Sequence, residues 1–300
     1  MTMNARPIAA LCLVLLASLP LPLAAATPVD ERRPATPTLQ LRVDNIAGSI
    51  EVVVGSDDAL VVTGELGEGS KPLRIEGGPE RMSVRVEPEN GGGWRQRMAP
   101  TRLRLEVPAR TRLEVNTVSA DIRVDGVSGE RLELETVSGS IDAVSAAGQV
   151  TLKSVSGGIE GRGEGRQWTV GTVSGAVSLD GIAGDLRVES VSGAIELAAG
   201  PVTRLRGETV SGRIRASVPL TQAATVAMQS VSGAIELSLP GPVDARIQAS
   251  TFSGPVRSDF GTPERGGIGG GQRLDVREGS GAAEVRLESF SGSVRILRGG

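Results

Sequence analysis

The chain has 300 residues, of which 39% are hydrophobic, 2% are aromatic and 41 are glycine, and its formal net charge is −3. It contains no histidine, and its one cysteine is Cys12. This composition excludes Ser-His-Asp catalysis. With Cys12 inside a segment expected to be removed, it also excludes Cys-His catalysis and the usual zinc sites, and the mixed charge offers no basic patch for nucleic acid.

The first 26 residues have the pattern of a secretory signal peptide. Arg6 precedes an apolar run from Ile8 to Leu23, and three alanines at 24–26 form a small-residue cleavage site. A membrane anchor is the alternative, but Pro20 and Pro22 interrupt this short run. We therefore expect cleavage after Ala26, a periplasmic or secreted protein, and no transmembrane segment in the mature chain.

Two irregular segments follow the signal peptide. Residues 27–38 contain three prolines and are predicted to be a linker. Residues 39–112 alternate apolar and polar side chains without a fixed repeat, and residues 90–97 are predicted to be an exposed loop. We expect 39–112 to cap the first coil of the repeats that begin at residue 113, with 39–300 forming one continuous domain.

A six-residue phrase recurs through the rest of the chain. It reads Thr or Ser, a β-branched or aromatic residue, Ser, Gly, a free position, then Val or Ile, with weaker copies at 45–50 and 117–122. Full copies begin at Thr136, Ser154, Thr172, Ser190, Thr209, Ser230, Thr251 and Ser289. The serines at 119, 138, 156, 174, 192 and 211 lie 18 or 19 residues apart. A fixed period of this length predicts a stacked repeat architecture.

The residues around each phrase alternate as they do in half-buried strands. Apolar residues stand four and two positions before the first Thr or Ser and five positions after it, as Trp168, Val170 and Val177 do around Thr172. The alternation slips at Val-Ser-Gly, which predicts a corner between two strands. Glycine suits such a corner because it takes positive φ or lets the next coil approach closely, and a Ser hydroxyl can satisfy backbone groups there. We interpret the phrase as structural rather than as a binding surface.

These features predict an all-β fold, a single-chain parallel β-helix or solenoid with coils of about 18–21 residues and Thr/Ser-Val-Ser-Gly corners. Nine or ten coils at ~4.8 Å would span roughly 45 Å. Right-handed winding is expected because parallel crossovers are overwhelmingly right-handed, although left-handed β-helices with similar coils exist. Residues 259–284 depart from the period and are either a degenerate coil or an inserted loop.

The pattern resembles a known family. An Ala-x-Ala signal, irregular strands, Leu105-Glu106-Val107-Pro108 before the first coil and the iterated Thr-Val-Ser-Gly-x-Ile phrase are similar to the bacterial putative-adhesin family. This is a β-strand-repeat domain of unknown function in exported envelope proteins. The resemblance covers about residues 39–300 and implies a β-solenoid outside the cytoplasm. It supplies no catalytic residues.

Outward charged columns are the remaining candidates for chemistry. One column, immediately before the corner, holds Glu135, Lys153, Glu189 and Glu208. The other, after the Ile, holds Asp142, Glu160, Glu196, Arg215 and Glu236. We interpret both as solvated ladders with some cross-coil ion pairs. Lys153-Ser154 is not a catalytic pair because adjacent strand residues point to opposite faces. The glycine run 266–271 lacks the Lys-Ser/Thr and the helix of a phosphate loop.

No catalytic, cofactor-binding or metal-binding residue is therefore assigned, and no cofactor is expected. The first functional hypothesis is a non-enzymatic, adhesin-like binding module of the cell envelope, with an envelope glycan or protein as its partner. The second is a structural or accessory envelope protein that pairs by strand addition, or self-associates, through an open last coil at 289–300. A β-helix enzyme acting on polysaccharides, using Asp and Glu pairs, is a weaker third.

Overall fold

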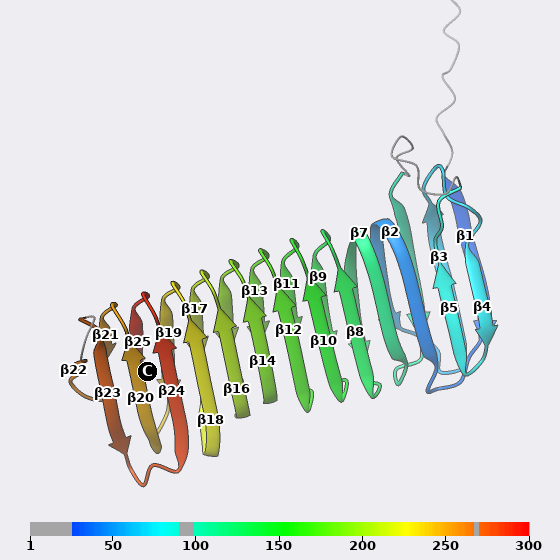
Figure 1. The fold of residues 1–300 in the computed structure, drawn as a ribbon. Coiled ribbons are helices and arrows are strands. Elements are labelled where there is room, and N and C mark those ends of the chain that lie inside the picture. The colour runs from blue at the N-terminus through cyan, green and yellow to red at the C-terminus, as the bar shows by residue number, and fades with distance from the viewer. Residues whose placement is uncertain (1–25, 90–98, 267–269, 300) are drawn as a thin grey trace, which may run out of the picture.

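A computed structural model describes residues 26–89, 99–266 and 270–299. The expected signal peptide, up to residue 25, and the expected loop at 90–97 lie outside these residues. Within them the chain forms 25 strands in one hydrogen-bonded sheet, wound into an elongated solenoid (Figure 1). The predicted all-β parallel solenoid is confirmed. In the described part of the chain no helix is long and apolar enough to cross a membrane.

Each central coil contributes two strands on either side of a corner. The strands before the corner are β8 (Arg131–Thr136), β10 (Gln149–Ser154), β12 (Gln167–Thr172), β14 (Gly184–Ser190), β16 (Val202–Thr209) and β18 (Leu220–Ser230). The strands after it are β9 (Ile141–Ser145), β11 (Ile159–Arg162), β13 (Val177–Asp180), β15 (Ile195–Ala198), β17 (Ile214–Ser217) and β19 (Ile235–Pro240). The chain rises along the front strand, crosses back at the corner and descends as it advances, which is right-handed winding (Figure 1).

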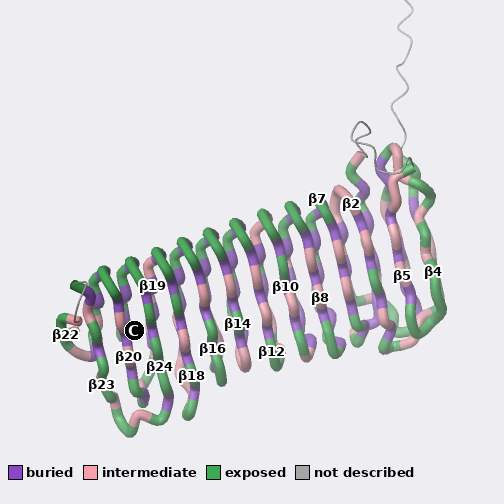
Figure 2. Tube along the Cα trace, in the orientation of Figure 1, coloured by how far each residue is buried: buried purple, intermediate pink, exposed green. Residues whose placement is uncertain are grey.

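Equivalent residues of successive coils pair in parallel register. Val150 pairs with Leu132 on one side and with Trp168 on the other, and Ile159 pairs with Ile141 and Val177. The three predicted inward columns are buried throughout, and Figure 2 shows their alternation with exposed residues. The core is therefore a thin stack of aliphatic rows, as alternation with period two requires.

The largest buried side chain has a space made for it by a neighbouring glycine. Trp168 is fully buried in a core that is otherwise mostly aliphatic. A Cβ on Gly161 would lie 2.7 Å from a methyl of Leu179 and 3.1 Å from the Trp168 ring. Glycine at 161 thus accommodates the indole within one coil height.

The corner glycines are required by close approach between coils. A Cβ on Gly193 would lie 1.8 Å from the carbonyl oxygen of Gly175, and a Cβ on Gly175 would lie 1.9 Å from that of Gly157. No side chain can occupy such a position without moving the backbone. Neither glycine has positive φ. Of the two reasons expected for glycine here, close approach is therefore the one that applies.

The corner backbone is satisfied by the buried first residue of the phrase. The amide of Gly175 donates to Thr172 Oγ1 at 3.0 Å, and the amide of Gly157 donates to Ser154 Oγ at 2.9 Å. The serine of Ser-Gly itself, such as Ser174, is exposed. A buried amide without such a partner would cost about 1–3 kcal/mol.

The N-terminal end is not stacked in chain order. Its strands are β1 (Thr27–Pro34), β2 (Gln40–Val54), β3 (Ala59–Leu66), β4 (Arg74–Gly78), β5 (Arg81–Arg85), β6 (Thr101–Val107) and β7 (Arg112–Val127). Strand β2 lies between β7 on one side and β5 and β6 on the other, with parallel pairing on both sides. Strands β3 and β4 then add antiparallel to β6 and β5. The predicted linker at 27–38 is wrong, because 27–34 form β1, which pairs antiparallel with β3 along its whole length.

The C-terminal end is also rearranged. Its strands are β20 (Ala245–Thr251), β21 (Val256–Ser258), β22 (Glu264–Arg265), β23 (Gln272–Glu278), β24 (Ala283–Ser289) and β25 (Val294–Gly299). The last coil, β24 and β25, lies between the coil of β18 and β19 and the coil of β20 and β21, and pairs in parallel with both. The expected open last coil at 289–300 is therefore wrong, because both of its edges are already hydrogen-bonded.

The segment 259–284 closes this end. Within its described residues, β22 and β23 pair antiparallel, and β23 also pairs antiparallel with β20. The Arg246 guanidinium donates two hydrogen bonds to Asp275, at 3.2 and 2.9 Å, and Gln248 donates a third. These bonds lower the pKa of Asp275 to about 2. The segment is thus a docked antiparallel hairpin rather than a further coil.

The outermost strands at both ends carry charge. Strand β1 reads TPVDERRP and β23 reads QRLDVRE. Charged residues and proline on an edge strand hinder pairing with another chain. The ends of this solenoid are therefore poorly suited to strand addition.

Substitution of a corner glycine tests the close approach. We expect Gly193→Val and Gly175→Val each to lower the melting temperature by several degrees, because the added Cβ overlaps a carbonyl of the adjacent coil. A loss of 1 kcal/mol shifts the midpoint by about 2–4 °C in chains near this size. Gly171→Val is the control, since a Cβ at Gly171 meets nothing within 4 Å. Unchanged melting curves for both corner variants would contradict the assignment.

Removal of residues 283–300 tests the intercalated coil. Because β24 bridges β18 and β20, we expect the truncated chain to lose amide-exchange protection in β20 and β18, not only at its new end. If β20 instead kept wild-type protection, β24 could not be its hydrogen-bonded neighbour.

Candidate binding surface along the corners

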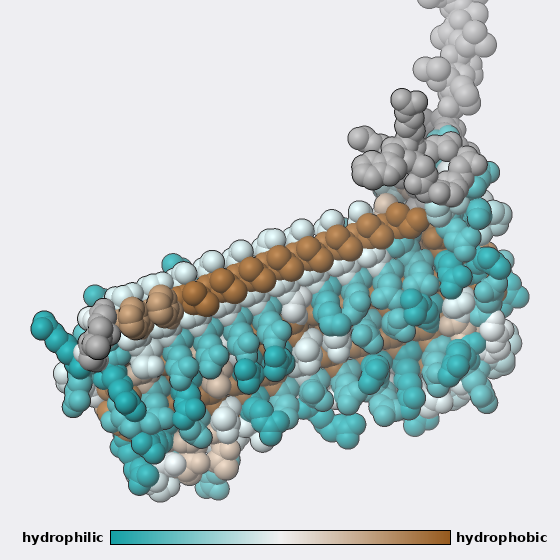
Figure 3. Space-filling view, in the orientation of Figure 1, coloured by the Kyte–Doolittle hydropathy of each residue, from teal (hydrophilic) through white to brown (hydrophobic). Residues whose placement is uncertain are grey.

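The second residue of the phrase forms an exposed apolar row along the solenoid. We call this row the ridge; it consists, in spatial order, of Val118, Val137, Val155, Val173, Val191, Val210, Val231, Phe290 and Phe252. These side chains are 43–57% exposed. Figure 3 shows the ridge as a continuous hydrophobic stripe on an otherwise largely hydrophilic face.

The ridge follows from the backbone of the corner. The first Thr or Ser of the phrase continues the inward alternation, so the next side chain must point outward. The amide of each following serine donates to the carbonyl of the ridge residue in the adjacent coil, as Ser192 does to Val173 at 2.9 Å. The ridge residues are thereby held in register from coil to coil.

The aromatic end of the ridge depends on the intercalated coil. Phe290 lies between Val231 and Phe252 because β24 lies between β18 and β20. The two phenyl rings stack with centroids 4.8 Å apart and an interplanar angle of 3°. Residues 38 positions apart in the sequence thus form one apolar platform.

The ridge accounts for most of the exposed apolar side chains. Of the eleven large hydrophobic side chains that are exposed among the described residues, nine belong to the ridge; Val54 and Val144 are the others. Burying the exposed half of one valine is worth roughly 0.5–1.5 kcal/mol. A contiguous exposed apolar row of this length marks an interaction surface in soluble proteins.

The corner strip is also nearly free of charge. It comprises the four residues after the first Thr or Ser in each of the nine coils from Thr117 onward, and its only charged members are Asp121 and Arg213. In the whole chain 22% of residues are charged. The strip therefore combines exposure with low desolvation cost.

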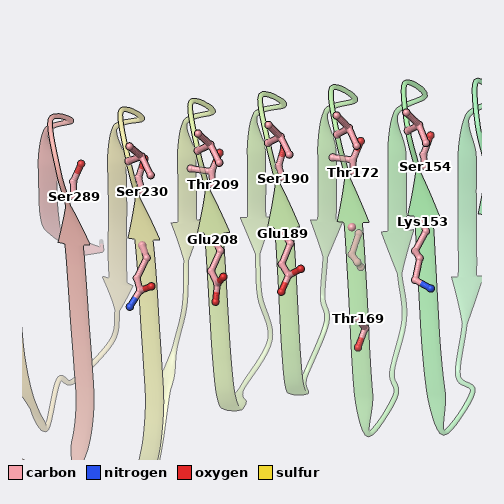
Figure 4. Close-up of a pocket in the computed structure, with 18 of the residues that line it drawn as sticks. Lys153, Ser154, Thr169, Thr172, Glu189, Ser190, Glu208, Thr209, Ser230 and Ser289 are labelled. Carbon is pink, nitrogen blue, oxygen red and sulfur yellow. The ribbon is translucent and has the colours of Figure 1, made fainter.

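A groove of about 1230 Å³ runs beside the ridge on the face formed by β8, β10, β12, β14, β16, β18, β24 and β20. Its floor is the column immediately before the corner residues, where Figure 4 shows Lys153, Glu189 and Glu208 projecting from successive strands. Gly171 leaves a gap in this column, since nothing lies within 4 Å of its Cβ position. The groove thus has an apolar wall and a polar floor.

The floor charges are engaged in ion pairs. Lys153 Nζ lies 2.6 Å from Glu135 Oε1, and this hydrogen bond raises the pKa of Lys153. Glu189 and Glu208 pair with Arg187 and Arg206 of their own strands. A row of carboxylates therefore lies next to the ridge, with guanidinium groups one step farther from it.

The second predicted charged column lies on the other sheet and is not brought together with the groove. Arg215 bridges Glu196 at 3.7 Å and Glu236 at 3.2 Å, and Arg295 lies 3.5 Å from Glu236. Asp142 lies between Arg123 and Arg162, and Glu160 pairs with Arg162. The predicted ion-pair ladders are confirmed. Among the described residues no group of three or more Asp, Glu or Cys side chains is placed to hold a metal ion.

The ridge is the feature that the sequence interpretation missed. The phrase was assigned a structural role, which its glycine and its first Thr or Ser do have. Its second position carried a further signal, because an outward valine repeated at every corner is not needed for the core. The same six residues thus encode both the corner and an exposed surface.

Comparison with solved structures gives distant matches. A putative adhesin from Bacteroides fragilis is 10% identical with a TM-score of 0.45, covering 91% of this chain and 98% of that one. A putative adhesin from Parabacteroides merdae is 10% identical with a TM-score of 0.45, covering 91% and 97%. A putative lipid binding protein from Parabacteroides distasonis is 16% identical with a TM-score of 0.44, covering 91% and 97%. None of the curated proteins compared with the chain matches it.

Comparison with family models is more specific. The model described as Toastrack DUF4097 matches residues 145–297, which contain most of the regular coils, the intercalated coil and the closing hairpin. This match extends over half of the chain and agrees with the repeat solenoid described above. The chain therefore belongs to the Toastrack DUF4097 family.

Proposed function

We propose that this protein is an exported, non-enzymatic binding module of the cell envelope that engages its partner lengthwise through the ridge and the adjoining groove. The observation that carries the proposal is the ridge: nine apolar side chains, 43–57% exposed and in register, in a strip almost without charge. The core does not require these side chains to be apolar. Their recurrence at every corner is explained by a partner that covers them.

Two features of the sequence support export. Arg6, the apolar run from Ile8 to Leu23 and the alanines at 24–26 form a signal-peptide pattern. The sequence from residue 27 onward contains no cysteine, so the mature fold needs no disulfide. The partner is a component of the envelope, a glycan or a protein.

Strand addition at the chain end is not retained as a second function. The coil that would supply the free edge is paired on both sides, and the strands that do lie at the ends are charged. A polysaccharide-active enzyme is not retained either, because the candidate carboxylates stand in ion-paired rows.

Export is tested by fractionating cells that express the full-length chain and sequencing the N-terminus of the product. We expect the protein in the periplasm, the envelope or the medium, beginning at Thr27. A cytoplasmic product that retains Met1 and the apolar run would contradict export.

The role of the ridge is tested by retention on intact cells or envelope fractions of the native organism. We expect the triple variant Val173→Ser, Val191→Ser, Val210→Ser to lose retention, because it removes three adjacent apolar side chains from the middle of the ridge. The matched control is Val54→Ser, Val144→Ser, which alters the two exposed valines outside the ridge. Melting curves verify that both variants fold, and equal retention of the triple variant and wild type would refute the proposal.

A further inference from the structure

We propose that the occupant of the ridge is a second copy of this chain, paired ridge against ridge about a two-fold axis. This inference rests on the proposed function, whose partner it names. The surface concerned is the ridge together with the exposed serine row beside it, the second and third residues of each phrase.

Spacing is the first argument for a second copy. The ridge repeats once per coil, at ~4.8 Å. An α-helix repeats every ~5.4 Å, so it drifts by ~0.6 Å per coil and loses a whole repeat over the eight intervals of the ridge. An extended peptide places same-side residues every ~6.6 Å and loses register sooner. Only another solenoid of the same repeat matches the ridge along its full length.

Side-chain shape is the second argument. Two identical rows of β-branched side chains, shifted by half a repeat, interdigitate as the faces of a steric zipper do. Val173, Val191 and Val210 lie in the uniform central part of the ridge, where no large side chain interrupts the row. At the far end, Phe252 and Phe290 stack on each other and continue the same row.

Charge is the third argument. Pairing along the corner strip desolvates few ionic groups, since Asp121 and Arg213 are its only charged residues. The carboxylate row of the groove, including Glu189 and Glu208, lies beside the contact rather than within it. That row disfavours an anionic membrane surface as the occupant, because such surfaces attract basic clusters.

The size of the contact indicates a weak pair. Two residues from each of nine coils give 18 residues per copy. A standard protein interface uses about 20–30 residues a side. Because the contact falls at the lower end of this range, we expect association that depends visibly on concentration, as suits contact between copies held on one envelope or on two facing envelopes.

Sedimentation equilibrium of protein expressed from the full-length sequence tests the pairing. We expect a monomer–dimer equilibrium for wild type, weakened roughly tenfold or more by Val173→Ser, Val191→Ser, Val210→Ser. Val144→Ser, at an exposed valine outside the ridge, should pair as wild type does. Melting curves establish that the triple variant is folded.

Cysteine cross-linking provides an independent readout in a Cys12→Ser background. Val191 is the fifth of the nine ridge residues, so a two-fold pair with full overlap places it next to its own copy. We expect Val191→Cys to form a disulfide dimer on mild oxidation and Val144→Cys not to.

The outcomes separate this inference from the proposed function. A wild type that remains monomeric at ~1 mM, or a triple variant that pairs as tightly as wild type, overturns self-pairing. If wild type is monomeric but retention on envelopes still depends on the ridge, the proposed function stands and the occupant is another molecule. If wild type dimerises through the ridge and envelope retention is independent of it, self-pairing stands and the proposed envelope partner falls.

Discussion

The structure depends on one contact, the approach of each corner glycine to the carbonyl oxygen of the coil before it. At Gly157, Gly175 and Gly193 a Cβ would lie 1.7–1.9 Å from that oxygen. The contact sets the coil separation at the corner. Because the buried Thr or Ser hydroxyl takes the glycine amide, as Thr172 does for Gly175, the turn is satisfied without water. All later features of the molecule inherit this spacing.

The apolar ridge is a consequence of the same geometry. With the first residue of the phrase turned inward and the glycine pressed on its neighbour, the residues between them must face solvent. Valine there contributes little to the core, yet it recurs from Val118 to Val231 and is replaced only by Phe290 and Phe252. A structural role explains the glycine and the hydroxyl of the phrase, whereas a binding role explains its second position.

The sequence determines the coil more completely than it determines the order of the coils. The inward columns could be predicted because period two leaves no choice of face, and Trp168, Val170 and Val177 are buried as expected. Stacking order could not be predicted, because the phrase at Ser289 can follow the one at Ser230 as well as the one at Thr251. The structure uses the first of these possibilities and also pairs Ser289 with Thr251 on the other side. Strand β1 was missed because its prolines suggest a linker, whereas edge strands tolerate proline.

The most direct test of the account is hydroxyl-radical footprinting of Phe252 and Phe290, the two reactive aromatic residues of the ridge, with the purified protein and with the protein on its native envelope. The account predicts strong labelling of both rings in dilute solution and protection of both on the envelope, while Phe260, which is buried in the core, is labelled weakly in each state. Equal labelling of Phe252 and Phe290 in the two states would contradict the central claim that the ridge is a surface covered by a partner.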